Sequence, residues 1–259
     1  MKRTVKYILF GVVMYVIFMA GTVPAPWVYK HWMQNRLGSW VLYGVQGTVW
    51  EGRASLVKSG NIRVKNLHWD LHPLSLLWGR LEAALQFNYA DAPGTLVLGR
   101  SLTGTWHVDD VDFEMPAEKL SPLLRLPGAE LGGKVAVNLS GLTVKKGRIV
   151  AAAGSVAWEK AAVSKPVAVD LGTFAMNVKT TSNGINGTLL DKGGAVQAQG
   201  LLKLSADGKK YQLTATFASR DPQQPLLTQG LRLFGTPGPD GRINYSASGS
   251  VPSILPGTG

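Results

Sequence analysis

The sequence contains no cysteine among its 259 residues. That absence excludes disulfides, a thiol nucleophile and any zinc or iron–sulfur site with cysteine ligands. Charged residues are also scarce, at 17%, against roughly 25% in an average soluble domain. Together with 31 glycines, this scarcity favours many short strands and turns over long surface helices, which are rich in Glu and Lys.

Acidic residues and histidines are few, which limits the available chemistry. The chain has 16 Asp and Glu and 4 His, and no serine or carboxylate has an evident activating partner for hydrolysis. The acidic stretch HVDDVDFE at 107–114 is better explained as a strand whose charges discourage edge aggregation. We therefore predict no enzymatic activity, no catalytic residues and no cofactor.

The segment HWDLH at 68–72 contains suitable residue types for a metal site, but at unsuitable spacing. On a strand, His68, Asp70 and His72 share one face, while Trp69 and its leucine neighbours occupy the other. Same-face neighbours stand about 6.6–7 Å apart, so the two histidines are separated by twice that distance. The pattern favours a solvated polar face opposite a buried row that includes Trp69, and predicts no metal.

Only one long apolar run is present. Residues 7–23, YILFGVVMYVIFMAGTV, are uncharged and follow three cations. At ~1.5 Å per residue, this run is near the lower limit for a ~30 Å hydrocarbon core, and the cations predict a cytoplasmic N-terminus. A cleaved signal peptide is the alternative, although its apolar core is usually shorter. We predict a cytoplasmic tail and inner-membrane anchor at 1–23, a stalk at 24–40 and a periplasmic domain at 41–259.

The net charge of +11 indicates attraction to negatively charged partners. Without the three cations of the tail, the remainder carries 11 − 3 = +8, which would hold it near anionic lipid headgroups. Nucleic acid is the other common partner of a basic protein, but the predicted export from the cytosol argues against it.

Beyond residue 40, apolar and polar residues alternate with period two. The clearest cases are LEAALQFNY at 81–89 and YQLTATF at 211–217, and turn signals such as Lys146-Gly147 separate such runs. This pattern predicts an all-β fold, an antiparallel curved sheet that is an open half-barrel or sandwich-like. Brief helices are expected at 73–78, 116–124 and 226–234.

The block GVQGTVWEGRA at 44–54 is rich in glycine. Its glycines lack the Gly-x-Gly-x-x-Gly spacing of a dinucleotide-binding loop, and no helix follows. In a strand, Gly47 and Gly52 would let a backbone or large side chain approach closely, or mark a bulge. We predict that Trp50 anchors the core from the first strand after the stalk, and that the two glycines permit curvature there.

Small residues precede a tryptophan at three places, Trp50, Trp106 and Trp158, at intervals of 56 and 52 residues. The pattern has two explanations, an internal repeat of sheet modules or chance recurrence in a chain rich in glycine and valine.

The apolar face of the predicted sheet also has two interpretations. It packs as a core, or it stays open and holds an acyl chain or hydrophobic peptide, which would make phospholipid or lipid A a partner. The edges of an open sheet are places where another envelope protein can add a strand.

Three blocks carry a resemblance to a known family. GVQGTVWEGRA (44–54), LHWDLHPLSLLWGRL (67–81) and LRLFGTPGPDGRINYSASGSV (231–251), after a cationic tail and an apolar run, resemble protein N of the bacterial type II secretion system. The periplasmic part is also similar in style to AsmA-like proteins. The resemblance implies an accessory of the inner membrane that contacts other secretion components. It gives Pro73 a structural or interaction role alongside the glycines and tryptophans above.

Overall fold

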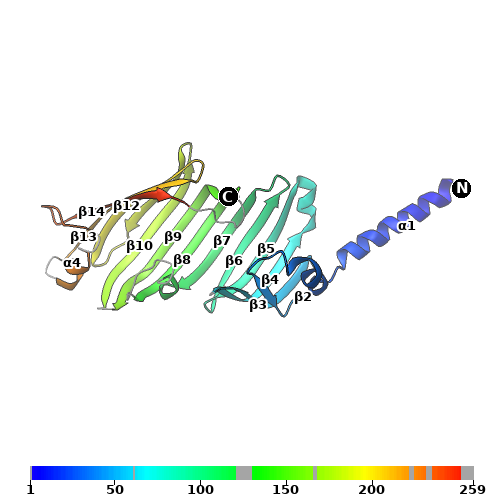
Figure 1. Cartoon of the computed structure of the whole chain (residues 1–259), viewed down its shortest axis with the longest axis horizontal. Helices are drawn as coiled ribbons and strands as arrows, with labels where there is room; N and C mark the ends of the chain where they lie inside the picture. Colours follow the sequence, from blue (N-terminus) through cyan, green and yellow to red (C-terminus); the bar gives the residue numbers. More distant parts are fainter. Residues whose placement is uncertain are drawn as a thin grey trace. The chain divides into compact units, whose positions relative to one another are not determined.

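The computed structural model describes residues 2–60, 62–120, 130–165, 168–221, 225–231 and 235–251. The chain divides into two compact units, Met1–Pro93 and Gly94–Gly259 (Figure 1). The boundaries predicted at residues 23 and 40 stay predictions. Each unit is described by itself below.

Unit 1 contains three helical segments followed by a small antiparallel sheet. The helical segments are α1 (Lys2–Gly21), α2 (Ala25–Val28) and a π-helix, η1 (Tyr29–Met33). The remaining elements are β1 (Val41–Tyr43), β2 (Gln46–Gly47), β3 (Glu51–Ser59), β4 (Ile62–His72), the 3-10 helix η2 (Pro73–Trp78) and β5 (Arg80–Tyr89).

The predicted transmembrane anchor finds no support here. Among the described residues, no helix is long and apolar enough to cross a membrane. α1 begins at Lys2 and ends at Gly21, so its first turns hold the three cations.

The strands of unit 1 confirm the predicted alternation. In β4, Trp69 lies opposite Gly52 of β3 and Leu85 of β5, so the three share one face. His68 lies opposite Arg53 on the other face, together with Asp70 and His72. The predicted strand at 81–89 is contained in β5.

Unit 2 is a larger antiparallel sheet with two short helices among its described residues. Its strands are β6 (Ala92–Ser101), β7 (Trp106–Pro116), β8 (Glu130–Lys145), β9 (Arg148–Lys165), β10 (Val169–Thr181), β11 (Gly184–Asp191), β12 (Val196–Ser205), β13 (Lys210–Ser219) and β14 (Ile243–Ser250). The helices are the 3-10 helix η3 (Ala117–Leu120) and α4 (Pro225–Leu231).

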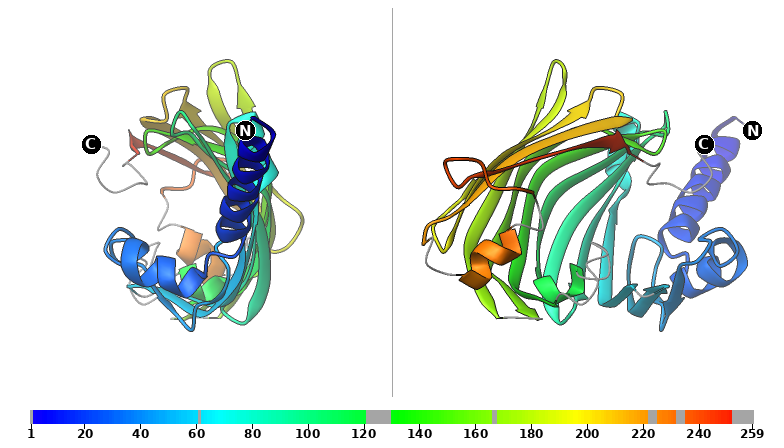
Figure 2. Two further views of the ribbon diagram at one scale, coloured as in Figure 1. Left: turned by 90° about the vertical axis from the view of Figure 1, so that its right-hand side faces the viewer. Right: turned by 60° about the vertical axis from the view of Figure 1, so that its left-hand side comes forward.

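Each strand of unit 2 pairs with its neighbour in the sequence, from β6 to β14. Tight turns make this order possible. Between β8 and β9, Lys146 and Gly147 both have positive φ, at 49° and 71°, as a two-residue hairpin turn requires. The antiparallel all-β prediction is therefore confirmed, and Figure 2 shows the strands of this unit as curved.

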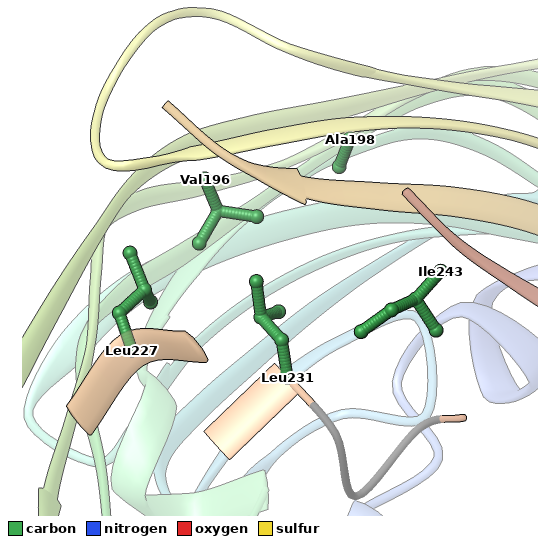
Figure 3. Packing of buried hydrophobic residues seen from close by; sticks show 5 residues of the cluster. All are labelled: Val196, Ala198, Leu227, Leu231 and Ile243. Carbon is green, nitrogen blue, oxygen red and sulfur yellow. The ribbon is translucent and has the colours of Figure 1, made fainter. Parts of the chain in front are cut away.

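One face of the unit 2 sheet is apolar and partly covered by helices. Trp158 lies opposite Val135 and Phe174, and farther along this row Phe217 lies opposite Ala198 and Ile243. Both helices lie on this concave side (Figure 2). α4 inserts two leucines into a cluster of Val196, Ala198, Leu227, Leu231 and Ile243 (Figure 3), and η3 adds Ala117 to Leu131 and Val135. At these places the face is a packed core.

The three brief helices fall where the sequence predicts them. η2 has the predicted bounds, 73–78. η3 and α4 lie within or beside the predicted ranges 116–124 and 226–234, of which residues 121–124 and 232–234 lie outside the described part of the chain.

Candidate protein-contact surface

The most exposed apolar side chains of the unit 1 sheet region gather in η2. The fractional exposures are 73% for Leu74, 43% for Leu76, 81% for Leu77 and 86% for Trp78. We call these four residues the η2 patch. A contiguous group of exposed apolar side chains often marks an interaction site. Tryptophan is enriched among the residues that dominate binding.

The η2 patch is held by a well-defined turn. Pro73 occupies the first turn of the helix, where its missing N–H costs nothing. The Ser75 hydroxyl donates to the carbonyl of His72 at 2.5 Å and accepts from the amide of Glu82 at 3.3 Å. Gly79 ends the helix in the left-handed conformation, at φ 72°. The apolar side chains are thus displayed by a fixed backbone, which lowers the entropy cost of binding.

A chain of hydrogen bonds links the strand before η2 to the residues just after α1. The amide of Val49 donates to the carbonyl of Val23 at 3.0 Å, just after α1. One residue on, the carbonyl of Trp50 accepts from the amide of Leu71 at 2.6 Å, two residues before η2 begins. The end of α1, the β2–β3 bend and the start of η2 therefore lie at one end of the unit 1 sheet.

The glycine block closes this end of the sheet as a hairpin. Gly47 lies opposite Gly52. The amide of Thr48 donates to the Glu51 carbonyl at 2.8 Å, and the amide of Glu51 donates to the Thr48 hydroxyl at 3.0 Å. Trp50 consequently lies half-buried in the bend between β2 and β3, and its predicted place in a strand is wrong. The turn at Gly47, with φ 88°, interrupts the period-two pattern on which that prediction depended.

Gly52 permits a close approach by Trp69. The indole ring lies so near that an added Cβ on Gly52 would be 2.4 Å from Cζ2 of Trp69 and 2.7 Å from the carbonyl oxygen of Gln46. The indole Nε1 donates to the carbonyl of Val49 at 3.1 Å. Trp69 therefore ties the hairpin to the sheet.

Trp106 and Trp158 lie in unit 2, in different settings. Trp106 begins β7, with the guanidinium of Arg100 at 5.0 Å from its ring centre. Trp158 lies within β9, donates from Nε1 to the carbonyl of Gly132 at 2.9 Å and contacts Phe174 with ring centres 6.1 Å apart. Because Trp50 occupies a bend, the three tryptophans hold no equivalent positions, and the chance explanation of their spacing is favoured.

Titratable groups in the described part of the chain occur in pairs and at strand ends rather than in a metal-binding cluster. No group of three or more His, Asp or Glu there is placed to hold a metal ion. In unit 2, burial raises the pKa of Asp191, but hydrogen bonds from Arg220 and from the amides of Ala198 and Gly193 outweigh it and hold that pKa below its ordinary value. Arg220 also donates to the Gly194 carbonyl at 2.9 Å, so this pair fastens strand ends together.

A shallow groove of about 560 Å³ crosses β11–β14 on the polar face of unit 2. No charged residue lines it. The side chains on this face come from Thr188, Leu190, Gln199, Leu201, Thr214, Thr216, Asn244 and Ser246.

The sequence pattern did not identify the η2 patch, although it placed Pro73. The available signal was PLSLLW, an apolar run that begins with proline and is followed by glycine. It is too short to form a helix with one buried face. Apolar residues are expected inside, so their exposure was not apparent before the structure.

Comparison with known proteins gives the family. The family model described as "Type II secretion system (T2SS), protein N" matches residues 38–246. The chain is 27% identical over 215 residues to the type II secretion system protein N of Vibrio cholerae serotype O1 (strain ATCC 39315 / El Tor Inaba N16961), covering 81% of this chain and 84% of that protein. No solved structure matches. Since the family match covers most of both units, the chain belongs to the protein N family of the type II secretion system.

Proposed function

We propose that this protein is a non-enzymatic component of the type II secretion system, held at the bacterial inner membrane with its bulk in the periplasm. It supports export of folded proteins by contacting other envelope components of the system. The observation that carries this proposal is the family match, which runs through both units from residue 38 to 246. The η2 patch supports the contact role, because it presents four exposed apolar side chains on a fixed turn.

The helix α1 is the proposed means of attachment. Those of its apolar side chains that the structure describes are exposed, among them Tyr7 at 76%, Phe10 at 65% and Phe18 at 67%. A helix that is apolar on all sides is stable when it is buried in protein or lipid. The η2 patch lies at the sheet end next to α1, so its partner is expected to be a membrane-proximal apolar surface of another secretion component.

A deletion strain tests the function. Loss of the gene is expected to reduce the amount of a secreted protein in the medium and to leave it in the periplasm, and the wild-type chain should restore export. Unchanged export in the deletion strain would contradict the proposal.

The η2 patch is tested in the same strain with Leu74→Ser, Leu77→Ser and Trp78→Ser combined. Because these side chains are exposed, the variant should fold and accumulate normally yet restore export poorly. The matched control is Leu102→Ser, which changes a side chain of 83% exposure in unit 2 and should restore export fully. Equal export by both variants would mean that the η2 patch makes no contact that export needs.

A photo-crosslinking residue at position 78 identifies the surface that η2 meets. Adducts with a protein of the secretion system are expected in intact envelopes. Adducts with lipid alone would overturn the protein-contact role of the patch and make it a membrane-binding surface.

A further inference from the structure

Two hairpins of unit 2 meet at one end of its sheet. The β8–β9 turn holds Lys146 and Gly147, and the β12–β13 turn holds Gly208. An added Cβ on Gly208 would lie 2.4 Å from the carbonyl oxygen of Ile149 and 3.1 Å from Cβ of Arg148. The β12–β13 turn therefore lies against the start of β9, although β10 and β11 separate these strands in the sheet order. This end is opposite the one that carries η3 and α4 (Figure 2).

The contact between the two hairpins gathers positive charge. The Arg148 guanidinium donates to the Val251 carbonyl at 3.3 Å, and the Val251 amide donates to the Lys209 carbonyl at 2.7 Å. The cations of the two hairpins are therefore held near one another. Four of them are exposed lysines, and the arginine is half-buried. We call the five residues the basic tip: Lys145, Lys146, Arg148, Lys209 and Lys210.

Little negative charge accompanies the basic tip. Asp207 is the one acidic residue of the two turns. Its carboxylate accepts from the Lys209 amide at 3.0 Å, and its ion pair with the Lys209 ammonium is long, at 3.7 Å. On the flanking strand β7, Asp109 lies beside Gly141, which is four residues, or about 13 Å, along β8 from Lys145. Positive charge thus exceeds negative charge at this end of the sheet.

We propose that the basic tip docks an acidic segment of another envelope component of the secretion system. The inference rests on the proposed function for the assembly to which the partner belongs. Like charges that a fold holds together repel one another, and carboxylates of a partner relieve that repulsion. Exposed charges of this kind speed association and select the partner more than they add affinity.

The surroundings of the basic tip favour protein carboxylates over lipid phosphates. Surfaces that lie in a membrane combine basic residues with apolar side chains that enter the acyl boundary. No large exposed apolar side chain lies in either turn, both of which the structure describes in full. Asp207, with 56% of its side chain exposed, would face a layer of phosphates with like charge. A protein segment can place a donor opposite Asp207 and carboxylates opposite the lysines, which gives specificity.

Zero-length crosslinking of the full chain in intact envelopes tests the docking. A water-soluble carbodiimide joins an amine to a carboxylate in contact with it and takes up the water that is released. We expect adducts between Lys209 and an aspartate or glutamate in an acidic segment of another secretion component, located by mass spectrometry of the linked peptides. Adducts of Lys209 with Asp207 of the same chain alone would overturn the docking.

Charge reversal supplies the matched comparison. Lys146→Glu combined with Lys210→Glu keeps Lys209 as the reporting amine and should lower its adducts about tenfold. Lys119→Glu combined with Lys192→Glu changes the net charge by the same amount at the other end of unit 2 and should leave these adducts unchanged. Equal losses in the two variants would mean that general charge attraction, rather than the basic tip, brings the partner near.

A charge swap tests whether the contact is direct. Replacing the mapped acids of the partner with lysine should abolish adducts with the wild-type chain. The same partner should form adducts with the chain that carries Lys146→Glu and Lys210→Glu, because the carbodiimide also joins the new lysines to the new glutamates. Absence of these restored adducts would overturn direct docking.

The outcomes separate this inference from the proposed function. A secretion defect in the deletion strain, without adducts between the basic tip and an acidic segment, would overturn the docking and leave the secretion role standing. Such adducts, together with unchanged export in the deletion strain, would support the docking and overturn the secretion role. A photo-crosslinking residue at position 146 that labels lipid alone would overturn the protein partner and make the tip a membrane-binding surface.

Discussion

At Gly52, the space of a side chain is taken by an indole ring. An added methyl group would lie 2.4 Å from Cζ2 of Trp69 and 2.7 Å from a backbone carbonyl oxygen, and neither neighbour can move without disturbing the β2–β3 hairpin. We expect Gly52→Ala to lower the free energy of unfolding by about 1–3 kcal/mol, measured by denaturant unfolding in detergent. Gly21→Ala, where nothing lies within 4 Å, should change it little, and equal effects would contradict the interpretation.

The same clash can be tested from the side of the ring. In a Trp69→Leu background, the alanine at position 52 should cost much less, because the obstructing ring is absent. A double-mutant cycle measures this coupling. Additive effects would mean that the cost of alanine arises from the Gln46 carbonyl rather than from Trp69.

The hydrogen bonds of Asp191 make the stability of unit 2 depend on pH. Its side chain is only 11% exposed, and hydrogen bonds from Arg220 and two amides hold its pKa below the ordinary value against the effect of burial. A carboxyl with a lowered folded-state pKa stabilises the fold above its unfolded pKa of about 3.9, and that contribution is lost as pH falls through the lower folded value.

Asp191→Asn should therefore be less stable than the wild type at pH 7, by about 1–2 kcal/mol. The difference should begin to shrink near pH 4, where the carboxyl of the unfolded chain binds a proton, and should vanish as pH falls through the lower folded-state pKa of Asp191. Urea unfolding between pH 3 and pH 7 checks both statements. Asp112→Asn, at an exposed position of β7, is the control, and a difference for Asp191→Asn that is constant across this range would contradict the linkage.

Among the elements, α4 has only seven residues and depends on its contacts with the sheet. Isolated helices of this length are not stable in water, and Leu227, 3% exposed, belongs to the buried cluster that also holds Val196, Leu231 and Ile243 (Figure 3). Leu227→Ala should cost about 2–4 kcal/mol and speed hydrogen exchange in α4 and β12. Leu102→Ala, at an exposed turn, should do neither, and unchanged exchange in the Leu227 variant would show that α4 does not hold the face closed.

Period-two alternation in the sequence predicted β5 and β13, and proline and glycine located η2, because both signals are local. Trp50 was assigned wrongly because the bend that holds it is closed by backbone bonds of Thr48 and Glu51, which leave little mark on hydropathy. The exposure of Trp78 could not be predicted, since burial depends on what the rest of the chain covers.

For the whole molecule, the proposed attachment through α1 decides where the protein resides. Replacing residues 2–21 with a cleavable export signal should move the protein from the membrane pellet to the soluble periplasmic fraction, because the exposed apolar side chains of α1 are removed. Quantitative fractionation measures this shift. Retention in the pellet would contradict attachment through α1, and repeating the experiment with the η2 patch changed to serine would show whether Trp78 and its neighbours hold the protein there.

The strand order of unit 2 has a consequence for how the chain reaches its final form. From β6 to β14, every strand pairs with the one before it in sequence, so most contacts are local. The short loops that connect the strands cost little entropy to close. A chain delivered from its N-terminal end can therefore assemble strand by strand, with each new strand adding to a finished template. Within the described residues β14 is the last strand in this order, so it is also the last strand to find its template.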